Sequence, residues 1–387
     1  MQNKALLSHS WFIILLVIPF LKPESISSMT ELNIIVGMWQ VASIFAIILL
    51  YIKCQDHISK FLIIVGSYQL CLLLSTVIYT NKLGLGLRRM LTAFFLCALI
   101  EIACETDAKC FIQSIYKVLW VWVFLNFISV ILFSSHSNEI IMYFLGIRVT
   151  FTYVMITAIT AGFLCIEYKK NNYIIPQFIL VGMVLFSLVK VWVATGLLSI
   201  VILLFMCVMV SSGSKLKKLI NFRWIITAGI ALNIAIVIFR IQNLFQFIIV
   251  DILQKDLTFT GRTALWNHAL KLISKRFLIG YGVATMKIEV PEMGENFSIY
   301  YGHSQLIQIL IEGGIIGSLL FLGMLYICGK KIMKYQNSNM ALILTSGLFV
   351  NIIIMITEVP AYYSYYFILL ALGYNMKNLV HHEQLST

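Results

Sequence analysis

Long apolar runs recur along almost the whole chain, with only short polar segments between most of them. A helix needs about 20 apolar residues to cross a bilayer, because each residue adds 1.5 Å to its length. Apolar windows fall at residues 6–21, 32–52, 61–79, 90–104, 118–133, 149–166, 173–189, 191–210, 222–239, 304–328, 340–357 and 362–376. Only 11% of the 387 residues are charged, whereas soluble domains carry about 25%. The sequence therefore predicts an all-α polytopic membrane protein with about twelve transmembrane helices.

The positive charge follows the topology of such a protein. A net charge of +12 would suggest nucleic acid in a soluble protein. Here the lysines cluster in short loops, which indicates the positive-inside rule and contact with anionic membrane lipid, so no nucleic-acid partner is expected. The bias places the N- and C-termini in the cytoplasm. One segment disagrees, because "TNKLGLGLRR" puts Lys82, Arg88 and Arg89 outside. Either the helix count is wrong there, or these cations meet an anionic group.

This topology divides the chain into three parts. Residues 1–239 form transmembrane helices one to nine, residues 240–303 an extracytoplasmic loop, and residues 304–387 helices ten to twelve and a cytoplasmic tail. The first apolar run lacks a small-residue cleavage site, so we expect it to be retained as a helix. The loop contains "LFQFIIVDILQ" and "RTALWNHALKLISKRF", both patterned as short amphipathic helices. Such helices can lie on the outer membrane surface or pack against the bundle.

Arg262 and Trp266 lie one helical turn apart at the start of the second amphipathic pattern. A helix N-terminus favours anions, and an arginine adds a bidentate fork that suits phosphate. The functional interpretation is a phosphate clamp at Arg262, and the alternative is a surface arginine at the membrane interface.

A polar stripe runs along the apolar stretch "YYGHSQLIQILIEGGIIG". Gln305, Gln308 and Glu312 share one face of the expected helix, and Tyr301 extends the line. An ionised carboxylate inside a membrane is costly unless it faces water or a partner. We therefore expect the stripe to line a polar cavity that opens outward. His303 lies at its mouth, where a histidine can act as a base near neutral pH or merely cap the helix.

Two features of the outer side allow more than one interpretation. Lys190 stands between two apolar windows, where it either marks a tight turn or offers a second cation to the cavity. The segment 357–367, "TEVPAYYSYYF", contains a glutamate and four tyrosines. Its tyrosines form an aromatic belt at the interface or stack on sugar rings.

Several common chemistries lack their motifs. The sequence contains no P-loop, GxSxG, HExxH or paired aspartates, and its eight cysteines form no CxxC pair. We therefore expect no metal site and no cofactor, and transfer from a nucleotide sugar is poorly supported.

The pattern "G-R-x-x-x-W … G-Y-G … G-H-S-x-x-x-Q-x-x-x-E-G-G-I-I-G" within residues 258–328 resembles the O-antigen polymerase/ligase superfamily. The resemblance implies a GT-C-like fold and bactoprenol-dependent synthesis of capsule, O-antigen or exopolysaccharide. It implies saccharide transfer from an undecaprenyl-diphosphate donor to a hydroxyl acceptor, without nucleotide or metal. By the same resemblance, Arg262 binds the donor diphosphate and His303 acts on the acceptor side.

The chain departs from the family pattern at two places. Ser304 follows the histidine, where the family usually has asparagine. An earlier Ser-Arg pair of the family is also missing, and Ala194 lies near the position of its arginine. Lys190, one turn back on the same face, is the candidate replacement for that cation.

These observations predict a polysaccharide polymerase of the bacterial cytoplasmic (inner) membrane, which joins undecaprenyl-diphosphate-linked oligosaccharides on the outer face. The predicted site residues are His303 and Glu312 for catalysis, Arg262 and Lys190 for the diphosphate, and Trp266, Tyr301, Gln305 and Gln308 as lining. A chain-length regulator and a flippase of the same pathway are expected partners. The alternatives are a ligase that moves a finished glycan and a transporter or flippase of lipid-linked sugars.

Overall fold

The computed structural model describes residues 6–79, 83–133, 141–168, 172–241, 262–284, 286–293 and 298–384. Its α-helices are α2 (Ser10–Val17), α3 (Glu24–Ser28), α4 (Thr30–Cys54), α5 (Lys60–Tyr79), α6 (Leu83–Leu132), α7 (Phe151–Tyr168), α8 (Ile174–Lys190), α9 (Ala194–Ser211), α10 (Phe222–Val237), α11 (Arg262–Lys275), α12 (Gln305–Met333), α13 (Asn339–Ile354), α14 (Ser364–Tyr374) and α15 (Met376–Gln384). The 3-10 helices are η1 (Ile18–Phe20), η2 (Lys215–Leu219), η5 (Pro291–Met293) and η6 (Pro360–Tyr362). Two strands of two residues each, β1 (Ile288–Glu289) and β2 (Ser298–Ile299), pair in antiparallel orientation.

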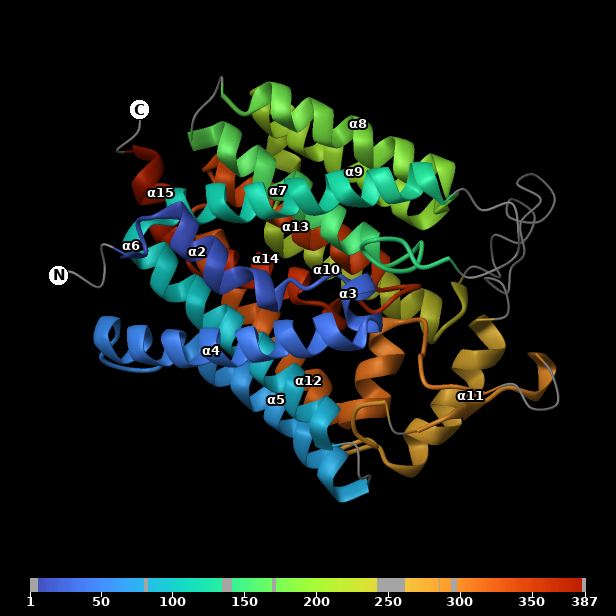
Figure 1. Ribbon diagram of the computed structural model, residues 1–387. Helices are drawn as coiled ribbons and strands as arrows, with labels where there is room; N and C mark the ends of the chain where they lie inside the picture. The colour runs from blue at the N-terminus through green and yellow to red at the C-terminus, as the bar shows by residue number, and fades with distance from the viewer. Residues whose placement is uncertain are drawn as a thin grey trace.

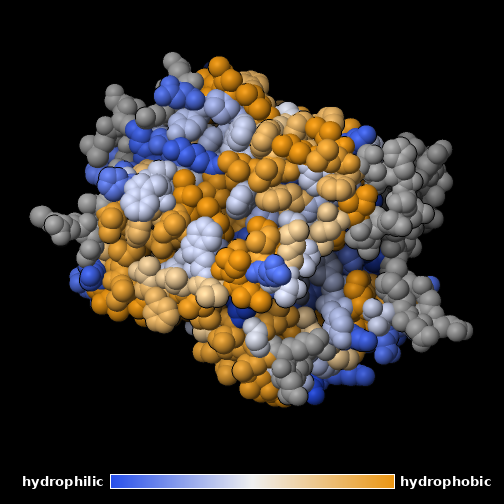
Figure 2. Space-filling view, in the orientation of Figure 1, coloured by the Kyte–Doolittle hydropathy of each residue, from blue (hydrophilic) through white to orange (hydrophobic). Residues whose placement is uncertain are grey.

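The chain is an all-α membrane protein, as its apolar windows predict. Within the described residues, six helices are long and apolar enough to cross a membrane, and shorter apolar helices accompany them. Hydrophobic side chains cover most of the middle of the surface in Figure 2. On α4, Met38, Phe45 and Ile52 are 70%, 64% and 71% exposed, which suits a helix whose outer face contacts lipid tails.

Each apolar window overlaps one of these helices, and two windows share α6. The backbone of Asp107 leaves the helical conformation (φ −155°, ψ 88°) and divides α6 into two segments. Its carboxylate accepts a hydrogen bond from the backbone N–H of Cys110 at 2.8 Å, so it caps the second segment. The two segments correspond to the windows 90–104 and 118–133.

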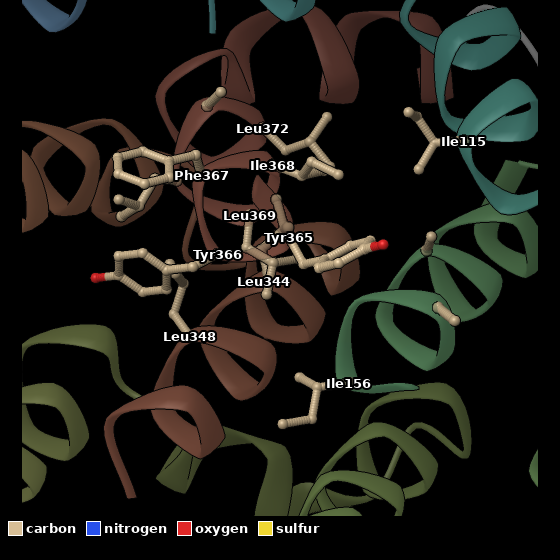
Figure 3. Packing of buried hydrophobic residues seen from close by; sticks show 14 of the residues in the cluster. Ile115, Ile156, Leu344, Leu348, Tyr365, Tyr366, Phe367, Ile368, Leu369 and Leu372 are labelled. Atoms are coloured by element: carbon tan, nitrogen blue, oxygen red, sulfur yellow. The ribbon is translucent and has the colours of Figure 1, made fainter. Parts of the chain in front are cut away.

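The core lies where α7, α13 and α14 meet. Almost every side chain of α14 is buried, and α7 is the most enclosed of the candidate spans. Figure 3 shows Tyr365, Ile368 and Leu369 of α14 packed toward Leu344 of α13 and Ile156 of α7. This core holds the C-terminal helices against the centre of the bundle, and thereby fixes the loop between α13 and α14.

The two ends of the bundle differ. Both termini lie at the left in Figure 1, and α11 lies at the opposite end. The first turns of α4 and α6 and the connection between α13 and α14 also lie toward that opposite end, which we call the α11 end. The predicted amphipathic helix "LFQFIIVDILQ" lies outside the described residues, as does Lys82. The second predicted helix is α11, and it packs on α12.

Candidate functional site

One tryptophan of α11 positions the segment that precedes α12. The side chain of Trp266 is fully buried, and its indole N–H donates to the carbonyl oxygen of Gly302 at 2.9 Å. The backbone N–H of Gly302 donates in turn to Gln308 Oε1 at 2.6 Å. A Cβ on Gly302 would lie 2.9 Å from Ile307 Cγ2, so the close approach favours glycine. The position of the next residue, His303, is therefore set from both α11 and α12.

Arg262, the first residue of α11, forms an ion pair with Glu358 from the loop between α13 and α14. Its Nη2 lies 2.9 Å from Glu358 Oε1. The hydroxyls of Tyr301 and Tyr153 donate to Glu358 Oε2 at 3.2 and 3.4 Å. Burial raises the pKa of the Glu358 carboxyl group, against the opposing effect of Arg262. The Arg262 side chain stays 23% exposed, so its remaining N–H donors can reach a bound anion.

His303 stands beside this ion pair in a strained backbone conformation, with a φ of 46°. Such strain in a non-glycine residue is common at functional sites. Its ring packs edge to face against Tyr301, with centroids 4.7 Å apart. Its Nδ1 is buried and has no hydrogen-bond partner among the described residues. Burial, and then Arg262, lower the pKa of the imidazole to about 4. The ring is therefore neutral at pH 7 and can accept a proton from a hydroxyl.

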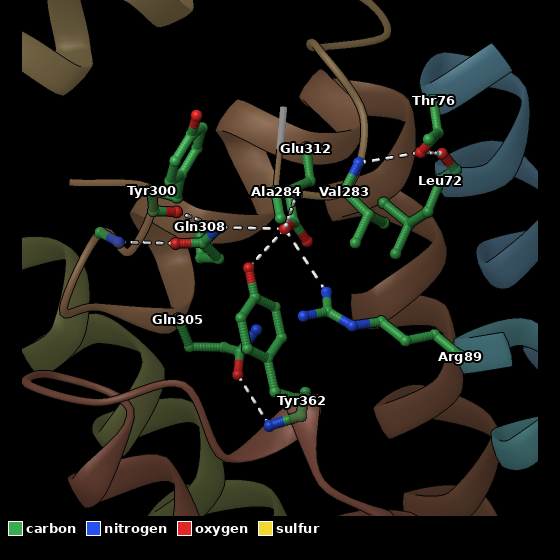
Figure 4. Close-up of polar contacts among 12 residues, drawn as sticks. Leu72, Thr76, Arg89, Val283, Ala284, Tyr300, Gln305, Gln308, Glu312 and Tyr362 are labelled. Carbon is green, nitrogen blue, oxygen red and sulfur yellow. Dashed lines mark hydrogen bonds and ion pairs between the residues drawn. The ribbon is translucent and has the colours of Figure 1, made fainter. Parts of the chain in front are cut away.

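Glu312 lies deeper and is held by several donors at once (Figure 4). Its Oε1 accepts hydrogen bonds from Gln308 Nε2 at 3.0 Å, from the backbone N–H of Ala284 at 3.2 Å and from the hydroxyl of Tyr362. Arg89 Nη1 lies 3.5 Å away, and its guanidinium also covers the Tyr362 ring at 3.7 Å. Because these contacts come from four segments, Glu312 connects them, and its buried charge is compensated.

The polar stripe lies on a helix that is broken, whereas the sequence predicts a continuous one. Gly314 has φ 60° and ψ −156° within α12. The backbone groups freed at this break pair with residues 277–282: the N–H groups of Tyr281 and Gly282 donate to the carbonyls of Ile311 and Glu312 at 2.7 and 2.9 Å. This pairing gives the buried peptide groups hydrogen-bond partners. It joins the motif "IGYG" to the motif "EGGIIG" through their backbones.

Gly280 lies at a close approach between the two backbones of this pairing. It has a φ of 66°, and a Cβ there would lie 2.5 Å from the carbonyl oxygen of Ile311 and 2.8 Å from the nitrogen of Gly314. Only glycine fits both the conformation and the space.

The structure brings together most of the residues that the sequence singles out. Tyr301 contacts both His303 and Glu358, and Trp266 binds Gly302, the residue before His303. Gln305 is buried and accepts from the backbone N–H of Ala361 at 2.9 Å, so it holds the segment that carries Glu358. Lys190 lies exposed at the end of α8, and among the described residues no hydrogen bond or ion pair joins it to this cluster.

The sequence-based prediction missed Glu358, Tyr153, Tyr362 and Arg89 as site residues. The segment 357–367 drew attention only as an aromatic belt or a sugar platform. Glu358 could have been recognised in the sequence as a carboxylate beside tyrosines at the end of an apolar window. A buried charge at such a place needs a partner such as Arg262. Within the part of the chain that the structure describes, no group of three His, Cys, Asp or Glu side chains could hold a metal ion.

A family model described as O-antigen ligase matches residues 123–322, slightly more than half of the chain. The matched region contains α11, His303 and the broken helix up to Leu322. No curated protein matches the chain.

Proposed function

We propose that this chain, which belongs to the O-antigen ligase family, is a polysaccharide polymerase that joins undecaprenyl-diphosphate-linked oligosaccharide repeat units. Members of the family are glycosyltransferase-like enzymes that act on lipid-linked glycans. The observation that carries the proposal is a neutral His303, whose buried Nδ1 has no hydrogen-bond partner in the described part of the chain, beside the partly exposed guanidinium of Arg262. One group can take a proton while the other receives negative charge.

The reaction that this pair serves is displacement at an anomeric carbon. An acceptor hydroxyl gives its proton to His303 as its oxygen bonds to the anomeric carbon. The bond from that carbon to the diphosphate oxygen breaks, and the polyprenyl diphosphate leaves with the electron pair. Arg262 stabilises the developing charge, and Glu358 holds Arg262 in position. The imidazolium then releases its proton to water, so the products are a lengthened lipid-linked glycan and undecaprenyl diphosphate.

In this proposal Glu312 is a positioning residue. Its carboxylate already receives hydrogen bonds from Gln308, Ala284 and Tyr362 and an ion pair from Arg89. These contacts support a role in fixing the positions of α12, η6 and the start of α6 relative to one another.

The α11 end faces the outside of the cytoplasmic membrane in this proposal, with about twelve crossing helices and both termini inside. A transporter of lipid-linked sugars is the rival that the break in α12 favours, because broken helices occur in transporters. Here, however, residues 277–282 satisfy the freed backbone groups.

Reconstitution with a single substrate tests the function. In vesicles that contain only this protein and its lipid-linked repeat unit, we expect a ladder of longer lipid-linked glycans on a gel. Glycan transfer only to an added acceptor of another class would instead identify the ligase. Movement of the sugar across the membrane without lengthening would identify the transporter and refute the polymerase.

The pH dependence of kcat/KM tests the role of His303, because this parameter reports groups of the free enzyme. A pKa lowered to about 4 means that the basic form predominates above that pH. We expect kcat/KM to fall as the pH approaches 4, and no histidine limb near the ordinary value of about 6.5. Because burial also raises the pKa of Glu358, the profile is repeated with Glu358→Gln. If kcat/KM instead fell with a limb near pH 6.5 in both the wild type and Glu358→Gln, the assignment of a lowered pKa to His303 would be contradicted.

A further inference from the structure

A cavity of about 320 Å³ at the α11 end gathers three cations, Lys22, Arg88 and Arg89. Lys22 comes from the connection between η1 and α3, and the two arginines come from the first turns of α6. Tyr362 and Glu312 also line the cavity, and Figure 4 shows Arg89 directed toward both. Arg88 and Arg89 belong to the segment "TNKLGLGLRR", which disagrees with the simple charge bias.

The positive charge of this cavity is only partly compensated. Glu312 pairs with Arg89, and the other lining carboxylate, Glu24, accepts a hydrogen bond from Tyr363 at 2.9 Å. Lys22 donates to the neutral Asn33, and no described carboxylate forms an ion pair with Lys22 or Arg88. Burial, and then repulsion from Arg88, lower the pKa of Lys22 to about 8. Two neighbouring cations that form no ion pair with a described carboxylate can attract an anion.

An apolar groove runs from this cavity along the surface between α4 and the first segment of α6. Gln40 and Arg88 line both hollows, and Gln40 Nε2 donates to Thr92 Oγ1 at 2.7 Å where they meet. The groove walls are Val41, Ile44, Leu87 and Leu91. Gly37 and Gly84 leave it open, because a Cβ at either position would meet no atom within 4 Å. Since the outer face of α4 is exposed and apolar, the groove opens toward lipid.

We propose that this composite site binds the polyprenyl diphosphate part of a lipid-linked saccharide, with the diphosphate on Lys22, Arg88 and Arg89 and the first isoprene units between α4 and α6. The identity of the lipid rests on the proposed function. Charge complementarity favours this occupant over a phospholipid: two linked phosphates match clustered cations, and arginine forks bind phosphate oxygens in pairs. All of these residues lie outside the region that matches the family model, so the assignment rests on this chain's own geometry.

The composite site connects to His303 through two tyrosine rings. The Arg89 guanidinium lies 3.7 Å from the centre of the Tyr362 ring. The centroids of the Tyr362 and Tyr301 rings are 5.9 Å apart, and those of the Tyr301 and His303 rings are 4.7 Å apart. A saccharide on this diphosphate extends along Tyr362 and Tyr301 toward His303, so the lipid bound here is the acceptor: its hydroxyl gives the proton to His303, while the donor diphosphate leaves beside Arg262.

Binding of undecaprenyl diphosphate without sugar tests the head-group half of the site. The full-length protein in phosphatidylcholine nanodiscs is titrated with this lipid. The double substitution Lys22→Gln and Arg88→Gln should weaken binding by about tenfold or more, because each removes a charge-assisted contact. Arg148→Gln, an exposed cation between α6 and α7, is the control and should bind like wild type. Equal affinity of the double variant and wild type would overturn the proposal, as would equally tight binding of phosphatidylglycerol.

A pair of glycine substitutions tests the groove. Gly37→Trp fills the groove and should weaken binding of undecaprenyl diphosphate about tenfold, while inorganic pyrophosphate binds as to wild type. Gly182→Trp is the matched control, because a Cβ at Gly182 on α8 also meets no atom within 4 Å. Unchanged lipid binding by Gly37→Trp would refute the groove as the tail site. Neither assay requires glycosyl transfer. If the wild-type protein binds the lipid but elongates no glycan, the proposed function is refuted and the proposed lipid site is not.

Discussion

Replacing His303 by alanine is expected to lower the rate of glycosyl transfer by about 100- to 10,000-fold, the usual range for losing a positioned general base. The substitution removes the buried Nδ1, which bonds to none of the residues that the structure describes, but leaves the ion pair of Arg262 and Glu358 in place. The initial rate at which the glycan ladder forms, measured with the reconstituted protein, is the readout.

The chain offers a matched control for this experiment. His268 lies on α11 and bonds to the exposed Glu292 at 3.0 Å, away from the Arg262–Glu358 pair. His268→Ala should therefore keep nearly the wild-type rate. If His303→Ala made polymer at the wild-type rate, while reaching the membrane in the same amount, His303 would have no part in proton transfer.

Replacing Gly280 by alanine is expected to lower the free energy of unfolding by about 2–5 kcal/mol, since a left-handed residue with a Cβ costs about 1–2 kcal/mol and overpacking about 1–3 kcal/mol. The added methyl group would lie 2.5 Å from the carbonyl oxygen of Ile311. It would thereby push residues 277–282 away from the break in α12. Thermal unfolding in detergent micelles measures the change.

Gly182→Ala provides the comparison for this prediction. No atom lies within 4 Å of a Cβ at Gly182, so alanine there should be neutral or slightly stabilising through its higher helix propensity. Equal unfolding temperatures for Gly280→Ala and wild type would mean that the pairing between the loop and α12 is not tight.

Much of the fold could be predicted because hydropathy is a local property. The windows 90–104 and 118–133, for example, each correspond to a segment of α6 even though the helices join at Asp107. The break at Gly314 could not be predicted in this way. A glycine pair inside an apolar helix is compatible with close helix packing, and only backbone partners from residues 277–282 make an unwound turn stable.

The candidate site was predicted in part. The resemblance already singles out Arg262 and His303, and the structure places them beside each other, but Lys190 lies exposed on α8. The cations that line a cavity are instead Lys22, Arg88 and Arg89. The sequence already placed Arg88 and Arg89 on an unexpected side of the membrane. The charge bias, however, does not indicate which anionic group they contact.

The sequence by itself determined the membrane class, the helical segments and the family, because apolar length, helical spacing and a local motif are all read from neighbouring residues. Only the tertiary structure decided which charges meet. Arg262 and Glu358 are 96 positions apart, and Arg89 and Glu312 are 223 apart. The energy of an ion pair depends on the distance between its atoms and on burial from water, and both of these are set by how the helices pack.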